Sequence, residues 1–201
     1  MSTYVKKLKN YEKKFNIKKK GITITVSGLS GSGKSTIAET LAKKLKIKYK
    51  NMGDVFRELA KEKNISMEKF SKTRAKKTDI LLDEKCLKLA KEGNILLNGR
   101  LTGWVAGDNA EIRVWIKCDL KTRAKRVAER ENKTFQQAKR DITERDNVDK
   151  KRYKELYDID AENTEIYNYI FDNGKATYEE AITKPSKDIK LLLDKMDTTS
   201  N

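Results

Sequence analysis

The sequence predicts an α/β fold in which helices cover both faces of a doubly wound parallel β-sheet. Residues 22–26 are a β-branched run that is typical of a buried strand, and a glycine-rich loop connects them to a helical segment at residues 36–45. Residues 95–97 are continuously apolar, as in a parallel strand covered on both faces. Strand-like and helix-like segments alternate along the 201-residue chain. This length and pattern predict one domain.

The glycine-rich loop matches the phosphate-binding pattern G-x-x-x-x-G-K-[ST] at every fixed position. Its glycines let backbone N–H groups surround an anion, and the positive end of the following helix adds to the attraction. Lys34 is expected to reach the β- and γ-phosphates of a nucleoside triphosphate, and the Ser35 hydroxyl to bind Mg²⁺. A glycine-rich turn that binds nothing is the alternative, which the agreement of pattern and context disfavours. The predicted nucleotide-binding residues of this loop are Gly28, Leu29, Ser30, Gly31, Ser32, Gly33, Lys34, Ser35 and Thr36.

The net charge and the residue composition exclude several classes of protein and site. The formal net charge is +16, which suits a phosphate-rich ligand or a nucleic acid, although most of the lysines are expected on solvated helix faces. The chain has no histidine, so Ser–His and Cys–His nucleophilic catalysis and His-ligated metal sites are excluded. Cys86 and Cys118 belong to no paired motif, and no signal peptide or membrane-length apolar run is present. These features predict a cytoplasmic protein.

Residues 1–20 form a basic N-terminal extension. Tyr4, Leu8, Tyr11 and Phe15 share one face of a predicted amphipathic helix within it. The favoured interpretation is that this face packs on the body of the protein. A basic arm that binds RNA or an anionic membrane is the alternative.

Local patterns define the other elements. Apolar or β-branched runs predict strands at residues 22–26, 47–52, 95–97, 112–116 and 167–171. Helical spacing of apolar residues predicts helices at residues 34–46, 79–92, 120–130, 134–144 and 178–193, and further helices that begin at residues 54 and 66. A charged segment, residues 144–154, follows the helix that ends at residue 144.

Capping residues and proline set the expected ends of these helices. Asp54 and Ser66 are predicted N-caps, and Thr134 begins a capping box with a glutamine three residues later. Gly93 is expected to end the long helix before it. Pro185 predicts that the last helix is kinked or split near residue 183.

Two arginines are expected at the carboxyl edge of the sheet, where ligands bind in such folds. Arg57 lies in the first turns of the helix after the second strand, and Arg100 directly follows the strand at residues 95–97. Two arginines that converge on one phosphate hold it by charge-assisted hydrogen bonds. A surface salt bridge for each is the alternative.

A second set of arginines follows the fourth strand. Arg123, Arg126 and Arg130 share one helical face, and Arg140, Arg145 and Arg152 come later. On a mobile segment they could close over a transferring phosphoryl group and neutralise its charge. A solvated basic face is the competing interpretation.

The motifs together resemble the archaeal type of cytidylate kinase. The resemblance covers about residues 22–182 and rests on the phosphate loop and on the motifs Gly53-Asp54-x-Phe56-Arg57, Asn98-Gly99-Arg100-Leu101-x-Gly103-Trp104, Glu144-Arg145-Asp146, Lys151-Arg152-Tyr153 and Tyr157-x-Ile159-Asp160. It implies the fold of a P-loop NTPase with a five-stranded core (residues 21–52, 94–130 and 156–196), an insert that binds the nucleoside monophosphate (NMP; residues 53–93) and a lid (residues 131–155). Residues 197–201 are expected to be a disordered tail.

The resemblance also implies roles for individual residues. The implied catalytic residues are Lys34, Arg126, Arg130, Arg145 and Arg152. The implied substrate-binding residues are Gly53, Asp54, Arg57, Arg100, Gly103, Asp149 and Arg152. The chain departs from the family pattern at Asn98, where an acidic residue is usual and would order the water shell of Mg²⁺, and at Leu101, where bacterial members have an aspartate.

The expected activity is therefore Mg²⁺-dependent transfer of the γ-phosphoryl group of ATP to CMP or dCMP by a monomeric enzyme. AMP or UMP as the acceptor is the nearest alternative. A P-loop ATPase that binds RNA is the alternative from another class, and it has no need of an acceptor clamp.

Overall fold

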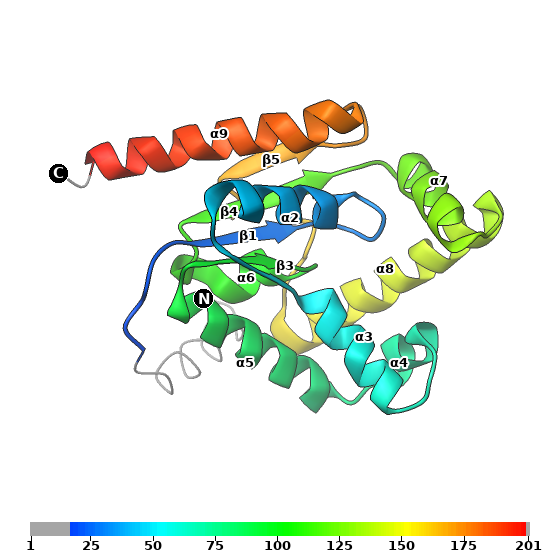
Figure 1. Ribbon diagram of the computed structural model, residues 1–201. Coiled ribbons are helices and arrows are strands. Elements are labelled where there is room, and N and C mark those ends of the chain that lie inside the picture. Colours follow the sequence, from blue (N-terminus) through cyan, green and yellow to red (C-terminus); the bar gives the residue numbers. More distant parts are fainter. Residues whose placement is uncertain (1–16, 200–201) are drawn as a thin grey trace.

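The structure is a computed structural model that describes residues 17–199, with one sheet at its centre (Figure 1). The strands are β1 Thr23–Ser27, β2 Lys48–Asn51, β3 Ile95–Asn98, β4 Ile112–Lys117 and β5 Tyr169–Asp172. They lie in the order β2-β3-β1-β4-β5, and all four neighbouring pairs are parallel. The predicted doubly wound parallel sheet is confirmed. The helix expected around Tyr4–Phe15 lies outside the described residues.

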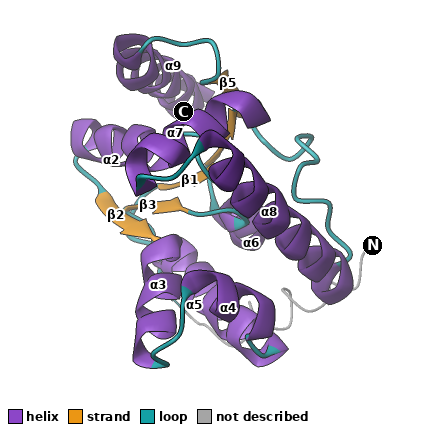
Figure 2. Ribbon diagram, turned by 90° about the vertical axis from the view of Figure 1, so that its right-hand side faces the viewer, coloured by secondary structure: helices purple, strands orange, loops and turns teal. Residues whose placement is uncertain are grey.

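Helices cover both faces of this sheet. They are α2 Lys34–Leu45, α3 Met52–Glu62, α4 Met67–Thr73, α5 Lys76–Glu92, α6 Thr102–Ala106, α7 Leu120–Glu131, α8 Phe135–Tyr157 and α9 Tyr178–Thr199, with the short 3₁₀ helix η1 Gly107–Asn109. Helices α2 and α9 lie on one face, and α5 and α6 lie on the other (Figure 1). Helices α3, α4 and α5 form a group beside the end of the sheet (Figure 2). Helix α8 contacts α4 of this group.

The core has two layers because side chains of a strand alternate between the faces of the sheet. Leu96 packs with Ile37, Leu41 and Ile189 of α2 and α9, whereas its neighbour Leu97 packs with the α5, α6 and α8 side. Both leucines are completely buried, as expected for a strand in the middle of the sheet. This packing fixes the carboxyl ends of the strands, where the candidate site lies.

Helices α7 and α8 form a hairpin with a small core of its own around Val127 and Ile142. The capping box predicted at Thr134 is confirmed. The prediction that its helix ends near residue 144 is wrong, because α8 continues through the charged segment to Tyr157. Buried side chains recur along it as far as Leu156 and Tyr157, and this packing outweighs the high charge of the segment.

Three other local predictions differ from the structure. The N-cap of α3 is Asn51, whose side-chain oxygen accepts a hydrogen bond from Gly53 N at 2.9 Å, so Asp54 lies in the first turn instead. Helix α9 passes through Pro185 without splitting, because Ala181 and Ile189 on either side of it pack in the core. This helix also extends to Thr199, within the predicted tail. Within the described part of the chain, none of the helices combines the length and apolarity that a membrane crossing requires.

Candidate functional site

The phosphate loop connects β1 to α2 and is shaped by glycines in the left-handed region. Gly31 and Gly33 have φ angles of 78° and 82°. A Cβ atom on Gly31 would lie 2.8 Å from the backbone oxygen of Arg123, and one on Gly33 would collide with the Asn173 side chain. Both positions therefore require glycine for their conformation and for close packing.

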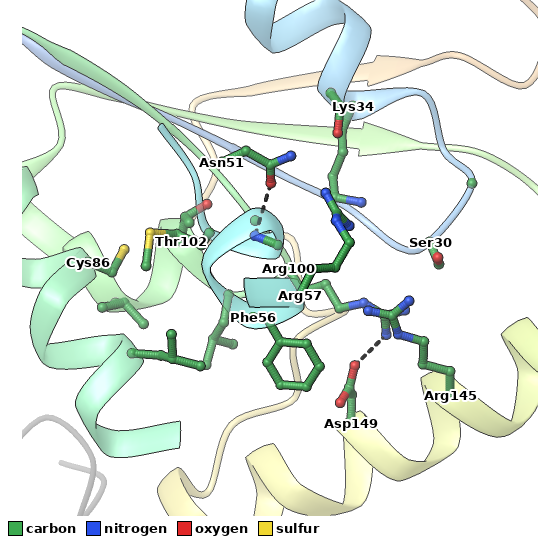
Figure 3. A pocket seen from close by; sticks show the side chains of 18 of the residues that line it. Ser30, Lys34, Asn51, Phe56, Arg57, Cys86, Arg100, Thr102, Arg145 and Asp149 are labelled. Carbon is green, nitrogen blue, oxygen red and sulfur yellow. Dashed lines mark hydrogen bonds and ion pairs between the residues drawn. The ribbon is translucent and has the colours of Figure 1, made fainter. Parts of the chain in front are cut away.

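Lys34 projects from the first turn of α2 into the cavity beside the loop (Figure 3). Its ammonium group donates a hydrogen bond to Leu29 O at 3.1 Å. Burial, followed by the nearby Arg100 and Arg145 guanidinium groups, lowers the pKa of Lys34 from 10.5 to about 7. A polyanion bound here would supply the missing negative charge.

The cavity has a volume of about 590 Å³ and opens at the carboxyl ends of β1, β2 and β3. One end is cationic and the other is largely apolar. Its cationic lining consists of Lys34, Arg57, Arg74, Arg100, Arg130 and Arg145. Its apolar lining includes Phe56, Leu82, Cys86, Leu101 and Val105. In Figure 3, Cys86 lies far from Lys34 and Arg145, with Phe56 between them.

Arg100 occupies the centre of the cationic end. Its Nη1 lies 2.7 Å from Asp149 Oδ2 and 3.0 Å from Asp146 Oδ1, and its buried Nη2 has no hydrogen-bond partner among the described residues. Asp146 also pairs with Arg123 at 2.7 Å, and Arg123 donates to Ser30 O of the phosphate loop at 3.1 Å. Two ion pairs and one hydrogen bond therefore connect Arg100 to the phosphate loop.

The other cavity arginines differ in their exposure and in their ion-pair partners. Arg57 is half exposed and pairs with Asp54 on its own helix. Arg130 pairs with Glu131 at the exposed rim. Arg145 forms no ion pair with a carboxylate of the described residues, and burial together with the Arg100 charge lowers its pKa. Arg145 is therefore a half-buried cation that an anionic ligand can partner.

Two arginines of the predicted catalytic set do not line the cavity. Arg126 donates to Asn173 O at 2.9 Å and to Ser32 O at 3.5 Å, which supports the phosphate loop from outside. Arg152 pairs with Asp79 and donates to Arg74 O at 3.1 Å. The side chains of both arginines are therefore engaged with other groups of the protein, outside the cavity.

The predicted substrate residues also separate into two groups. Gly53 and Arg57 line the cavity, as do Arg100 and Asp149. Asp54 lies behind Arg57, and Gly103 lies in α6, where a Cβ atom would approach the Tyr167 ring to 2.6 Å. Gly103 is thus needed for the packing of α6.

Several cavity residues were not identified from the sequence. Arg74 is buried and forms ion pairs with Asp79 at 2.6 Å and with Asp149 at 3.2 Å. It also lies over the Phe56 ring, 4.8 Å from the centroid. Asp83 reaches the same cavity from α5. None of these stands in a recognisable motif, and only the fold brings them to the site.

Ser35 and Asn98 meet where the sequence predicts a Mg²⁺ site. Asn98 Nδ2 donates to Ser35 Oγ at 3.0 Å and to the Tyr49 hydroxyl at 3.1 Å. The buried Asn98 Oδ1 has no partner among the described residues. Hydroxyl and amide oxygens suit a Mg²⁺ ion that keeps several waters and takes its negative charge from a nucleotide, so the donor set fits this metal. The described residues contain no cluster of three acidic or sulfur ligands.

Comparison with known proteins agrees with this geometry. A model described as the cytidylate kinase-like family matches residues 23–175. A protein of Methanocaldococcus jannaschii named cytidylate kinase is 38% identical over 157 residues, which cover 76% of this chain and 88% of that protein. One of the same name from Methanopyrus kandleri is 35% identical over 187 residues, covering 88% and 97% of the two chains.

A solved structure extends the comparison to the fold. A gluconokinase from Sinorhizobium meliloti superimposes with a TM-score of 0.61 at 13% identity, covering 92% of this chain and all of the other. At this identity the likeness concerns the fold alone. It supports a kinase-type α/β architecture for the chain.

Proposed function

The chain belongs to the cytidylate kinase-like family, and on that premise we propose that it catalyses ATP + (d)CMP → ADP + (d)CDP. The observation that carries the proposal is that two cationic side chains, Lys34 on the phosphate loop and Arg100 beside it, line one cavity. A kinase of this kind needs one site for the donor phosphates and another for the acceptor phosphate.

The donor half is the loop at residues 28–36. Its backbone N–H groups and the N-terminus of α2 receive the β- and γ-phosphates of ATP. Lys34 supplies the charge that moves with the transferring group. Arg123 and Arg126 hold the loop by its backbone oxygens and so keep it in the binding conformation.

The acceptor half is built on Arg100. Its guanidinium exchanges part of its contact with Asp146 and Asp149 for the phosphate of the monophosphate. Arg57 approaches the same cavity from α3 and adds a second cationic contact. Arg145, which has no carboxylate partner, and Arg130 at the rim neutralise charge on the transferring group.

Mg²⁺ belongs to the proposal as the ion that neutralises the ATP phosphates. The Ser35 hydroxyl would hold it directly, and Asn98 would hold one of its water ligands. Since neither residue carries charge, the nucleotide provides the negative charge of this site. The ion would bind less tightly than at a site that contains a carboxylate.

The transfer needs no general base. An oxygen of the CMP phosphate, already ionised at neutral pH, attacks the γ-phosphorus in line, and the bond to the β–γ bridging oxygen breaks as the new bond forms. The chain places cations around both phosphates. Closure of the α7–α8 hairpin would exclude water and limit hydrolysis of ATP.

A coupled assay that measures ADP formation with CMP, dCMP, UMP and AMP tests the proposal. We expect turnover with CMP or dCMP, and very little ADP when no monophosphate is present. A preference for AMP or UMP would move the assignment to that acceptor. ATP turnover that is independent of every monophosphate and rises with RNA would indicate the RNA-associated ATPase instead. The cytoplasmic location and the monomeric state stay predictions.

A further inference from the structure

The largely apolar end of the cavity is the natural place for a nucleobase. The cationic end takes phosphates, and Cys86 lies at the other end, beyond Phe56 (Figure 3). Cys86 belongs to the same hydrophobic cluster as Val105, which also lines the cavity. Ligand sites of this kind carry few polar groups, and these groups decide specificity. The polar group to examine is Asp83, one helical turn before Cys86 on α5.

Four carboxyl groups line the cavity, and three of them have cationic partners. Asp79 pairs with Arg74 and Arg152, and Asp149 pairs with Arg74 and Arg100. Glu131 pairs with Arg130 and Lys133. Asp83 forms no ion pair with any of the described residues. It is therefore the cavity carboxyl that has capacity for a ligand.

The contacts of Asp83 leave one oxygen available. The Tyr157 hydroxyl donates a hydrogen bond to Oδ2, whereas Oδ1 has no hydrogen-bond partner among the described residues. Burial raises the pKa of the carboxyl to about 7, against the opposing effect of the Tyr157 hydrogen bond, and the Asp79 charge raises it further. The available Oδ1 is therefore an acceptor for a hydrogen-bond donor of the ligand.

We propose that Asp83 recognises the base by accepting, at Oδ1, a hydrogen bond from the 4-amino group of cytosine. This inference rests on the proposed function. Acceptance by a carboxylate from the cytosine amino group is a standard pairing. Uracil presents a carbonyl oxygen at the same position, so two acceptors would face each other and uracil would be rejected.

Asp83 would discriminate cytosine from uracil, whereas discrimination against purines must come from another part of the cavity. Adenine carries an amino group next to a ring nitrogen acceptor, the same pattern as cytosine. Its exclusion must therefore depend on the size of the base. The proposal accordingly concerns the ratio of CMP to UMP use and makes no claim about AMP.

The test is the nearly isosteric substitution Asp83→Asn. With the amide oxygen still accepting from Tyr157, the amide nitrogen takes the place of Oδ1. It can donate to the 4-carbonyl of uracil, whereas the acceptor for the cytosine amino group is lost. We expect kcat/KM for UMP to rise and the CMP-to-UMP ratio of kcat/KM to fall by roughly tenfold or more. A ratio within about twofold of the unsubstituted enzyme would overturn the proposal.

Asp79→Asn is the matched control, because Asp79 lines the same cavity but is occupied by two arginines. We expect it to lower CMP and UMP use alike and to leave the ratio unchanged. Thermal melting of both variants checks that they fold.

A second measurement needs no variant. The ribonucleoside monophosphate of pyrimidin-2-one lacks the 4-amino group, and we expect its kcat/KM to be at least about tenfold below that of CMP. Equal use of the two would also overturn the proposal. If the unsubstituted enzyme fails to phosphorylate CMP at all, the proposed function fails, and this outcome is distinct from an unchanged ratio.

Discussion

Arg100 Nη1 lies 2.7 Å from Asp149 Oδ2, in a cavity where both side chains are nearly buried. The proposed acceptor clamp is thus held in place by a carboxylate before any phosphate arrives. Because Asp149 also pairs with Arg74 at 3.2 Å, the same contact joins α8 to the turn between α4 and α5. Substitutions on the two sides of this pair should therefore have different effects.

Arg100→Ala should raise the KM for CMP on the order of a hundredfold and the KM for ATP much less, because a buried charge-assisted contact to the acceptor phosphate is lost. The fold should survive, since Asp149 keeps Arg74 and Asp146 keeps Arg123. Steady-state kinetics with each substrate varied in turn measures this. The exposed Arg140 is a control whose alanine variant should change neither constant. Equal effects of Arg100→Ala on both constants would contradict the acceptor role.

Asp149→Asn should instead act first on stability. The substitution leaves two buried guanidinium groups with one carboxylate partner fewer each, and we expect a loss of about 2 to 4 kcal/mol in the free energy of unfolding. Urea unfolding of the free protein measures the loss. Asp108→Asn is the control, because Asp108 is fully exposed and its pair with Arg113 at 3.5 Å should contribute less than about 0.5 kcal/mol. An Asp149 variant as stable as this control would show that Asp79 and Asp146 alone neutralise the two arginines.

The sequence predicts the framework of this site better than its interior. The phosphate loop, the strand before Arg100 and the capping box at Thr134 depend on local patterns, and the structure contains them where they are expected. The continuation of α8 past residue 144 depends on tertiary packing that no local pattern records. For that reason the ion pairs that α8 brings to the cavity, above all those of Asp146, could not be foreseen.

Residue roles are harder to predict than elements for the same reason. Arg126 and Arg152 share helical faces with cavity arginines in the sequence, yet their side chains contact Asn173 O and Asp79. Asp83 stands in no motif and becomes a candidate only because its neighbours Asp79 and Asp149 are already paired. Assignment of partners among closely spaced charges requires the three-dimensional arrangement.

Binding of ATP should take up protons above neutral pH. In the free protein Lys34 has a pKa of about 7, so it is mostly neutral at pH 8, and triphosphate binding should return its pKa toward the ordinary value. We expect an uptake of close to one proton, about 0.9, at pH 8 and almost none at pH 5.5. Calorimetric titration in two buffers of different ionisation enthalpy measures this. Lys34→Met should remove the uptake, and a buffer-independent enthalpy at pH 8 would contradict the lowered pKa.

The same lowered pKa predicts how stability depends on pH. The unfolded chain binds a proton at Lys34 up to about pH 10.5, whereas the folded protein loses it near pH 7. Between these values the unfolded state holds more protons, so the contribution of Lys34 to the free energy of unfolding should rise with pH. Urea unfolding at pH 7 and pH 9 should show a smaller rise for Lys34→Met than for the unsubstituted protein. Identical slopes would mean that Lys34 stays protonated in the fold.

Gly103→Ala distinguishes a packing role from a substrate role for the Gly-Arg-x-x-Gly motif. The added Cβ atom would lie 2.6 Å from a carbon of the Tyr167 ring, and Gly103 N already donates to the buried Ser27 Oγ at 3.0 Å. Overpacking at such a position should cost about 1 to 3 kcal/mol of stability. Because Gly103 does not line the cavity, the KM for CMP should change less than about threefold at a temperature where the variant is folded. Gly53→Ala, a substitution within the cavity wall, is the comparison that should shift the KM for CMP more than it shifts the melting temperature. The reverse pattern for the two glycines would return Gly103 to the substrate site.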